Sequence, residues 1–188
     1  MEETHLNEVF DTLWQLYPMV QLTAVHLSER ELSKDLLKRE TADIFIAPST
    51  ILDGQHLEHS HWSGHYVLVV PQGYERQTHA QLFGSMPYLG YRHAGGERLM
   101  SQLAELPYLT QRGEISCVQT LLSLIGAGHC WSILPSTVLP PSPRKIRYMP
   151  LPMHLKRRIS VIARPMSLLS AAARVVIEIL KNSDRVAD

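Results

Sequence analysis

The chain has few cysteines and no excess of either charge. Only two cysteines occur among its 188 residues, which excludes a disulfide-built scaffold and suits a reducing cytosol. Lysine plus arginine and aspartate plus glutamate both number 18, so the formal net charge is zero. Because a module that grips DNA phosphates usually carries a basic excess, we expect this chain not to bind nucleic acid by itself.

Long apolar runs are also missing. No run approaches the roughly 20 residues of a membrane helix. The N-terminal sequence MEETHLNEVF is acidic and lacks the apolar centre of a signal peptide. We therefore expect a cytoplasmic protein that does not associate with membranes.

Signatures of catalysis and of cofactor binding are absent as well. The phosphate-binding patterns GxxxxGK(S/T) and GxGxxG do not occur, and no set of nucleophile, base and orienting residue can be recognised. Four of the ten histidines lie in residues 56–65, but their spacing fits no closed zinc site and no cysteine is nearby. We interpret this segment as a solvent-facing loop and expect no enzymatic activity, no cofactor and no metal.

What the chain does contain is an alternation of helical and strand patterns. Apolar residues make up 45% of the sequence, enough for a folded core. The patterns predict helices over residues 6–17, from a capping box of Ser28 and Glu31, around Leu99, and over 171–180. They predict strands over residues 20–24, 44–47, 66–70, 88–90, 146–149 and 159–163. Residues 51–65 are predicted to be a loop that then enters a strand, and residues 72–86 a polar, turn-rich segment. The α-β-α-β order of the first 50 residues favours a parallel sheet.

Residues 113–135 form the most informative stretch. Ser116 is a good helix N-cap, and an apolar helical stripe follows it at Val118, Leu121, Leu122 and Ile125. The sequence Gly-Ala-Gly at 126–128 predicts a left-handed helix end, and residues 131–134 predict a buried parallel strand. A strand that runs into a helix N-terminus points free N–H groups at the sheet edge, where α/β folds bind ligands. The alternative is an ordinary strand–helix–strand unit that binds nothing.

The two cysteines flank this helix. Cys117 lies at its start, where the helix dipole would favour a reactive thiolate, but a small and partly buried residue is the favoured interpretation. Cys130 lies beyond the other end, roughly 15–20 Å away at ~1.5 Å per residue. Because a disulfide needs Cα atoms within ~7 Å, we expect the two thiols to stay unpaired in the folded chain.

The composition changes near Pro71 and near Pro150. We infer two lobes, the first made of residues 1–71 plus 153–188 and the second of residues 72–152. The crevice between two such lobes is the expected ligand site.

The ordered set of motifs resembles the effector-binding (regulatory) domain of LysR-type transcriptional regulators. The resemblance rests on Phe10 with YPMVQL at 17–22, the segment 31–39 with ADIFI at 42–46, YVLVVP at 66–71, LLSLIGAG at 121–128 and WSILP at 131–135. It covers nearly the whole chain in the right order. The winged helix-turn-helix of such regulators has no counterpart here, and the family's first strand is reduced to Glu3-Thr4-His5.

The resemblance implies an α/β fold of two Rossmann-like lobes with a central cleft, similar to the type 2 periplasmic binding proteins. It implies a small polar or anionic effector in the cleft and a homodimer or higher oligomer that uses residues 6–17 and 117–125. DNA would be contacted only through a helix-turn-helix domain absent from this chain. The family's ligand-binding positions correspond here to Ser49, Thr50, Tyr91, Arg92, His93, Ser116 and Cys117.

Two other functions are compatible with a bilobal fold of this kind. A free-standing solute-binding protein is the nearer alternative, and a signal peptide or lipobox would favour it. An enzyme on the same fold is the other, and it would need an acid–base set in the cleft.

Overall fold

The computed structural model describes residues 3–25, 42–48, 54–93, 95–104, 106, 109, 111–153 and 155–183. The chain divides into two compact units, Met1–Ser63 with Arg158–Asp188, and Gly64–Arg157. We call these unit 1 and unit 2. Within the described residues, no helix has the length and apolar character needed to span a membrane.

The main sheet is antiparallel rather than parallel. Its strands run in the order β1 (Ile44–Pro48), β7 (Lys156–Ala163), β2 (Leu57–Pro71) and β5 (Ser132–Pro135), and β6 (Ile146–Met149) also pairs with β2. The pairs β1–β7, β2–β5 and β2–β6 are all antiparallel. The predicted parallel sheet is therefore wrong for these strands, because an apolar run shows that a strand is buried but not which distant strand pairs with it.

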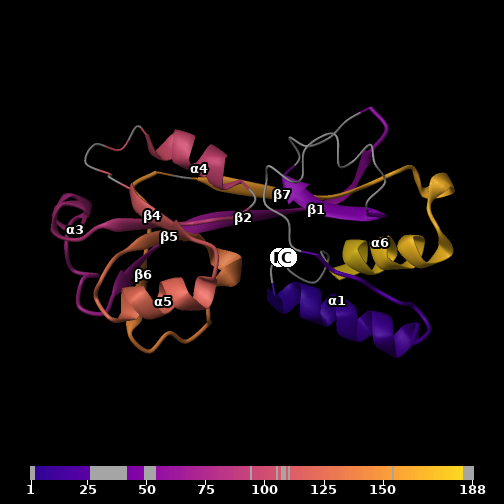
Figure 1. Cartoon of the computed structure of the whole chain (residues 1–188), viewed down its shortest axis with the longest axis horizontal. Helices are drawn as coiled ribbons and strands as arrows, with labels where there is room; N and C mark the ends of the chain where they lie inside the picture. Colours follow the sequence, from indigo (N-terminus) through magenta and orange to yellow (C-terminus); the bar gives the residue numbers. More distant parts are fainter. Residues whose placement is uncertain are drawn as a thin grey trace. The chain divides into compact units, whose positions relative to one another are not determined.

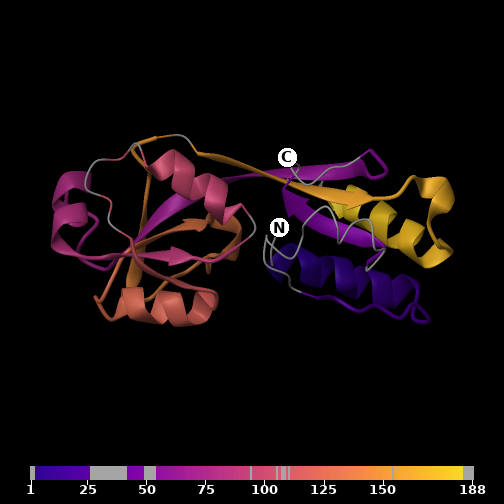
Figure 2. The same ribbon diagram turned by 45° about the horizontal axis from the view of Figure 1, so that its top comes forward.

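Unit 1 is built on two helices that lie side by side, α1 (Glu3–Leu16) and α6 (Ala171–Ser183) (Figures 1 and 2). The helices predicted over residues 6–17 and 171–180 are confirmed. Val9 and Leu13 of α1 are buried with Ile177 and Leu180 of α6 and with Val161 of β7. A short 3₁₀ helix, Met166–Leu168, precedes α6.

The sequence predicted a strand and then a second helix in the part of the chain that follows α1. The strand predicted over residues 20–24 is wrong, because residues 20–25 form no strand and residues 21–25 are exposed. Alternating residues alone do not make a strand, and no strand in the described part of the chain pairs with this segment. The helix predicted from Ser28 and Glu31 lies outside the described residues.

The histidine-rich segment is a strand and not the predicted loop, since β2 begins at Leu57. His56 is only 6% exposed and packs edge-on against Phe45. His59 Nε2 is 2.9 Å from the carbonyl oxygen of Arg164, to which it donates. The carboxylate of Glu58 accepts from Ser160 and from two nitrogens of Arg158, and Arg158 is the largest cause of its lowered pKa. The strand itself is formed by backbone pairing, since β2 pairs with β7 as well as with β5 and β6, and the local sequence does not specify these distant partners.

In unit 2, two layers of helices cover opposite faces of the strands. Leu68 and Val70 of β2 are buried in a core with Leu99 and Leu103 of α4 (Gly96–Leu103). Val69, between them, is buried in another core with α5 (Val118–Gly126). Because side chains alternate along a strand, α4 and α5 lie on opposite sides, as Figures 1 and 2 show. This explains why the run from Tyr66 to Val70 is apolar throughout.

A further helix, α3 (His79–Ser85), lies in the segment predicted to be polar and turn-rich, where no helix was predicted. Thr78 caps it, with the Gln81 N–H donating to the Thr78 hydroxyl at 3.3 Å and the Thr78 N–H donating to the Gln81 side chain at 3.0 Å. This capping box was a sequence signal for the helix. The remaining short elements are β3 (Tyr88–Tyr91), β4 (Gln111–Ile115) and a 3₁₀ helix, Ser136–Val138.

Candidate functional site

The two parallel strands of unit 2 end at the same edge. β3 and β4 pair in parallel, with Tyr91 opposite Ile115, and the Arg92 N–H donates to the Ile115 carbonyl oxygen at 2.9 Å. The residues that follow each strand are therefore neighbours. This pairing gathers five of the seven sequence-predicted positions, namely Tyr91, Arg92, His93, Ser116 and Cys117. The other two, Ser49 and Thr50, lie outside the described residues.

Helix α5 begins directly after β4, and its cap differs from the prediction. The N-cap is Cys117, in an extended conformation, and its side chain makes no capping hydrogen bond. Ser116 lies one residue earlier and is exposed, so the prediction that it caps the helix is wrong. The first turn of α5 contains no acidic residue. Its N–H groups and its dipole therefore favour an anion at this edge. At the other end, the predicted left-handed stop is confirmed at Gly128, with φ of 81°.

Helix α4 begins at the same edge, after β3, but it is less suited to an anion. Its N-cap is Gly95, whose φ of 90° requires the left-handed region that glycine adopts readily. Glu97 lies in the first turn of α4. A carboxylate there already uses the favourable potential of the helix N-terminus and repels a second negative charge. The N-terminus of α5 is therefore the better anion site of the two.

Arg92 forms an exposed ion pair. Its Nε lies 3.0 Å from Glu114 Oε2, and the two side chains are 63% and 39% exposed. Exposed pairs contribute about 0–1 kcal/mol. The guanidinium can therefore leave Glu114 for a negatively charged ligand at small cost.

His93 is held from both sides of its ring. It is 8% exposed, and its Nδ1 donates to the Tyr91 carbonyl oxygen at 2.8 Å. We assign the proton to Nδ1 because a carbonyl oxygen only accepts, and Nε2 then accepts from the Tyr66 hydroxyl at 3.1 Å. The ring also stacks on Tyr91, with centroids 5.2 Å apart. Tyr66, which the sequence motifs did not assign to the site, thus anchors the loop that carries Arg92.

Removing the Tyr66 hydroxyl should destabilise unit 2. The Tyr66→Phe variant loses a buried hydrogen bond donor to His93, for which we expect a drop of about 1–3 kcal/mol in the free energy of unfolding. Urea denaturation followed by circular dichroism measures this. Tyr148→Phe is the matched control, since its hydroxyl donates to Pro140 in an exposed position. Equal losses in the two variants would contradict the anchoring role of Tyr66.

The two cysteines differ in accessibility, and neither takes part in a disulfide bond. Cys117 is exposed, whereas Cys130 is fully buried and its burial raises the pKa of its thiol to about 11. The thiolate is the reactive form, so Cys130 stays protonated at pH 8. We expect iodoacetamide at pH 8 to label one thiol per native chain, and Cys117→Ser to abolish that labelling. Mass spectrometry of the labelled chain measures this, and rapid labelling of native Cys130 would contradict it.

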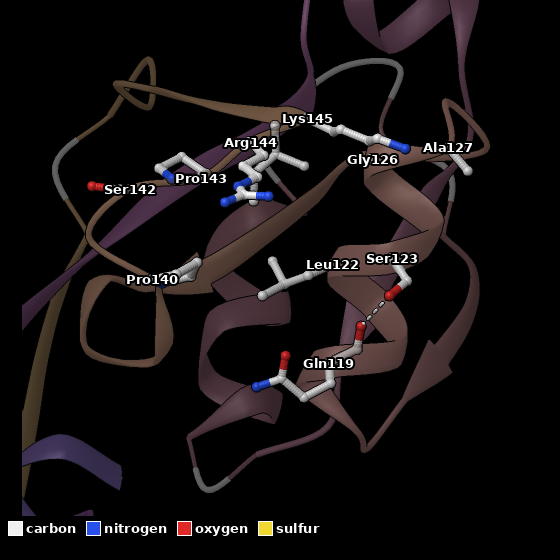
Figure 3. Close-up of a pocket in the computed structure, with 11 residues that line it drawn as sticks. Gln119, Leu122, Ser123, Gly126, Ala127, Pro140, Ser142, Pro143, Arg144 and Lys145 are labelled. Carbon is white, nitrogen blue, oxygen red and sulfur yellow. Dashed lines mark hydrogen bonds between the residues drawn. The ribbon is translucent and has the colours of Figure 1, made fainter.

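Two hollows elsewhere in unit 2 contain none of the five gathered residues. One, of about 440 Å³, lies between α5 and the loop before β6 (Figure 3). The other, of about 280 Å³, is lined by Tyr88 and Trp131 among others. In the part of the chain that the structure describes, no three histidine, cysteine or acidic side chains gather closely enough to hold a metal ion.

Comparison with known proteins identifies the family. The family profile described as "LysR substrate binding domain" matches residues 1–185. A comparison with curated proteins finds no match. Among solved structures, the chain is similar to HinK, a LysR family transcriptional regulator from Pseudomonas aeruginosa. The TM-score is 0.75 and the identity 16%, and 98% of this chain and 67% of that chain are covered.

Two solved domains are matched over nearly their whole length. The first is the effector binding domain of QuiR in complex with shikimate, with TM-score 0.73, 14% identity, and 100% of this chain and 93% of that chain covered. The second is the Synechocystis CcmR regulatory domain in complex with 2-PG. Its TM-score is 0.73 and its identity 12%, and the match covers 97% of this chain and 92% of that chain.

The fold is thus of the type 2 periplasmic-binding-protein-like class, as the sequence indicated. The chain belongs to the LysR substrate-binding-domain family, the effector-binding domains of LysR-type transcriptional regulators. Members of this family are parts of regulators rather than enzymes, and regulators of this type bind small-molecule effectors and act as oligomers.

Proposed function

We propose that this chain senses a small polar or anionic effector at the edge where β3 and β4 end. The parallel pairing of these strands carries the proposal, because it places Arg92 beside the start of α5. A helix N-terminus without an acidic first turn stabilises an anion by ~0.3–2 kcal/mol. The complexes of QuiR with shikimate, a carboxylate, and of CcmR with 2-PG support a small effector of this chemistry.

The five gathered residues have different roles in this proposal. The Ser116 hydroxyl donates to the anionic group of the effector, and Arg92 closes on the same group after leaving Glu114. Cys117 supplies the start of α5 and not a side-chain cap. Tyr91 and His93 support the loop through their stacked rings and hydrogen bonds. Ser49 and Thr50, which lie outside the described residues, are the two further positions that the resemblance assigns to the ligand site.

The proposal also includes self-association. The lobes are those inferred above, residues 1–71 plus 153–188 and residues 72–152, and an isologous dimer uses α1 and α5. Trp14 of α1 is 52% exposed, and Leu124 of α5 is partly exposed. DNA is contacted through a helix-turn-helix domain outside this sequence.

A ligand screen tests the effector proposal. We expect at least one small carboxylate or phosphorylated acid to bind the purified chain with 1:1 stoichiometry, measured by isothermal titration calorimetry with shikimate as the first probe. A bound effector also raises the unfolding temperature, since it binds the folded state alone. Uncharged analogues of the same shape serve as controls. Binding of the uncharged analogue as tightly as the acid would contradict the anion site.

A further inference from the structure

Glu114 lies beside Arg92 at the edge of unit 2 where β3 and β4 end. The Arg92 Nε donates to Glu114 Oε2 at 3.0 Å. Among the described residues, Arg92 is the only cation that pairs with Glu114. An effector that draws Arg92 away therefore leaves a carboxylate at this edge without its cation.

The stem of the Glu114 side chain is held against β3. Gly90 lies opposite Glu114 in the parallel pairing, and a Cβ atom at Gly90 would be 3.2 Å from Glu114 Cγ. The lack of a side chain at Gly90 thus leaves the space in which this stem packs. Because the packing does not involve Arg92, the carboxylate stays at the same edge when the guanidinium moves.

The two sides of this edge differ in their charge. Tyr88 of β3 is buried in the core with α4, whereas Leu89 packs against the core with α5. Side chains alternate along a strand, so Gly90 is on the α4 side, and so is Glu114, whose stem packs on it. Glu97 lies in the first turn of α4 and adds a second carboxylate. The start of α5 favours an anion instead, so the edge suits a ligand that carries both charges.

We propose that Glu114 determines the class of effector, because it accepts from an ammonium group on the carbon next to the effector's acid group. The inference rests on the proposed function and names its ligand as an α-amino acid. The acid group binds at Ser116, the start of α5 and Arg92, and the ammonium group replaces Arg92 as the partner of Glu114. Two residues of extended chain span ~6–7 Å between Cα atoms, so neighbouring groups of one small ligand reach both Ser116 and Glu114.

Simple acids and hydroxy acids fit these charges less well. A simple acid leaves the Glu114 carboxylate without a partner and close to a second carboxylate, and like charges repel. A hydroxyl group restores one hydrogen bond to Glu114 but not the opposite charge. An ammonium group restores both, and hydrogen bonds of charged groups are roughly twice as strong as those of neutral groups. We therefore expect affinity to fall from amino acid to hydroxy acid to simple acid.

Acids that differ only at the second carbon test this order. L-Alanine carries an ammonium group there, L-lactate a hydroxyl group and propionate a hydrogen atom. Titration of the isotope-labelled chain, followed by NMR through the backbone amide signals of Arg92 and Ser116, measures dissociation constants even when binding is weak. We expect L-alanine to bind at least about fivefold more tightly than propionate, with L-lactate between them.

Glu114→Gln keeps the shape of the side chain and removes its charge. We expect this variant to bind L-alanine less tightly and propionate more tightly, so that the two dissociation constants come within about twofold of each other. Glu178→Gln is the matched control. Glu178 also forms an ion pair, with Lys181 at 3.1 Å, but it lies on α6 of unit 1, so the variant should keep the native preference. Circular dichroism checks that both variants fold.

The outcomes separate this inference from the proposed function. Equal binding of the three acids by the native chain, or a preference for L-alanine that Glu114→Gln retains, would overturn the role of Glu114 and leave the anion site intact. The same holds if an acid of the ligand screen binds and L-alanine does not. If no acid of the screen or of this series binds, both the inference and the effector proposal are overturned.

Discussion

Replacing Trp131 with alanine will lower the free energy of unfolding of the chain by about 3–5 kcal/mol. Trp131 is 1% exposed, and its ring stacks on Phe83 at 4.6 Å and tilts against Tyr88 at 4.9 Å between centroids. Its Nε1 donates to the Met86 carbonyl oxygen at 2.9 Å. Truncation removes the ring contacts, leaves a cavity and leaves that buried carbonyl without this donor, so three costs add.

The Trp131→Phe variant separates these costs. Phenylalanine keeps an aromatic ring beside Phe83 and Tyr88 but has no N–H for Met86, so we expect a smaller loss, about 1–3 kcal/mol. Urea denaturation followed by far-ultraviolet circular dichroism measures both variants. Trp14→Ala, at an exposed tryptophan, is the control, studied at a concentration where the native chain is monomeric. A loss below about 1 kcal/mol for Trp131→Ala would show that this cluster is not central to the core of unit 2.

Replacing Ser116 with aspartate will weaken binding of an anionic effector at least about a hundredfold, which is roughly 2.7 kcal/mol. The new carboxylate lies at the start of α5, where the proposal places the anionic group of the effector, so two negative charges compete for the same N–H groups. Titration calorimetry with the acid identified in the screen measures the change. Ser101→Asp, at an exposed serine on α4, adds the same charge elsewhere in unit 2 and should leave affinity nearly unchanged.

The position of the helix cap makes a second substitution informative. Because Cys117 and not Ser116 is the N-cap of α5, Ser116→Ala removes no capping interaction. We expect this variant to keep its unfolding free energy within about 0.5 kcal/mol while losing affinity several-fold, as one hydrogen bond to a charged group is removed. If Ser116→Asp binds the acid as tightly as the native chain does, the anion site is not at the start of α5.

The local patterns of the sequence determined most of the elements of this protein. The stripe Val9, Leu13 predicted α1, and the stripe Val118, Leu121, Ile125 predicted α5, because burying one helical face requires that spacing. The apolar runs predicted the strands within β2 and β5, since a strand covered on both faces needs apolar residues throughout. The order of these motifs also indicated the family, which the match over residues 1–185 confirms.

Only the tertiary structure shows how the strands pair. It alone also shows which hydrogen bonds hold the residues of the site in place. Strand β1 pairs with β7 antiparallel, although the two are more than a hundred residues apart, and nothing local specifies that direction. The histidine-rich segment belongs to β2, which pairs with β7, and nothing in residues 56–65 specifies that partner. The hydroxyl that holds His93 comes from Tyr66, 27 residues away. Hydrogen bonds between residues so distant in the chain depend on the folded backbone and leave no periodic signal in the sequence.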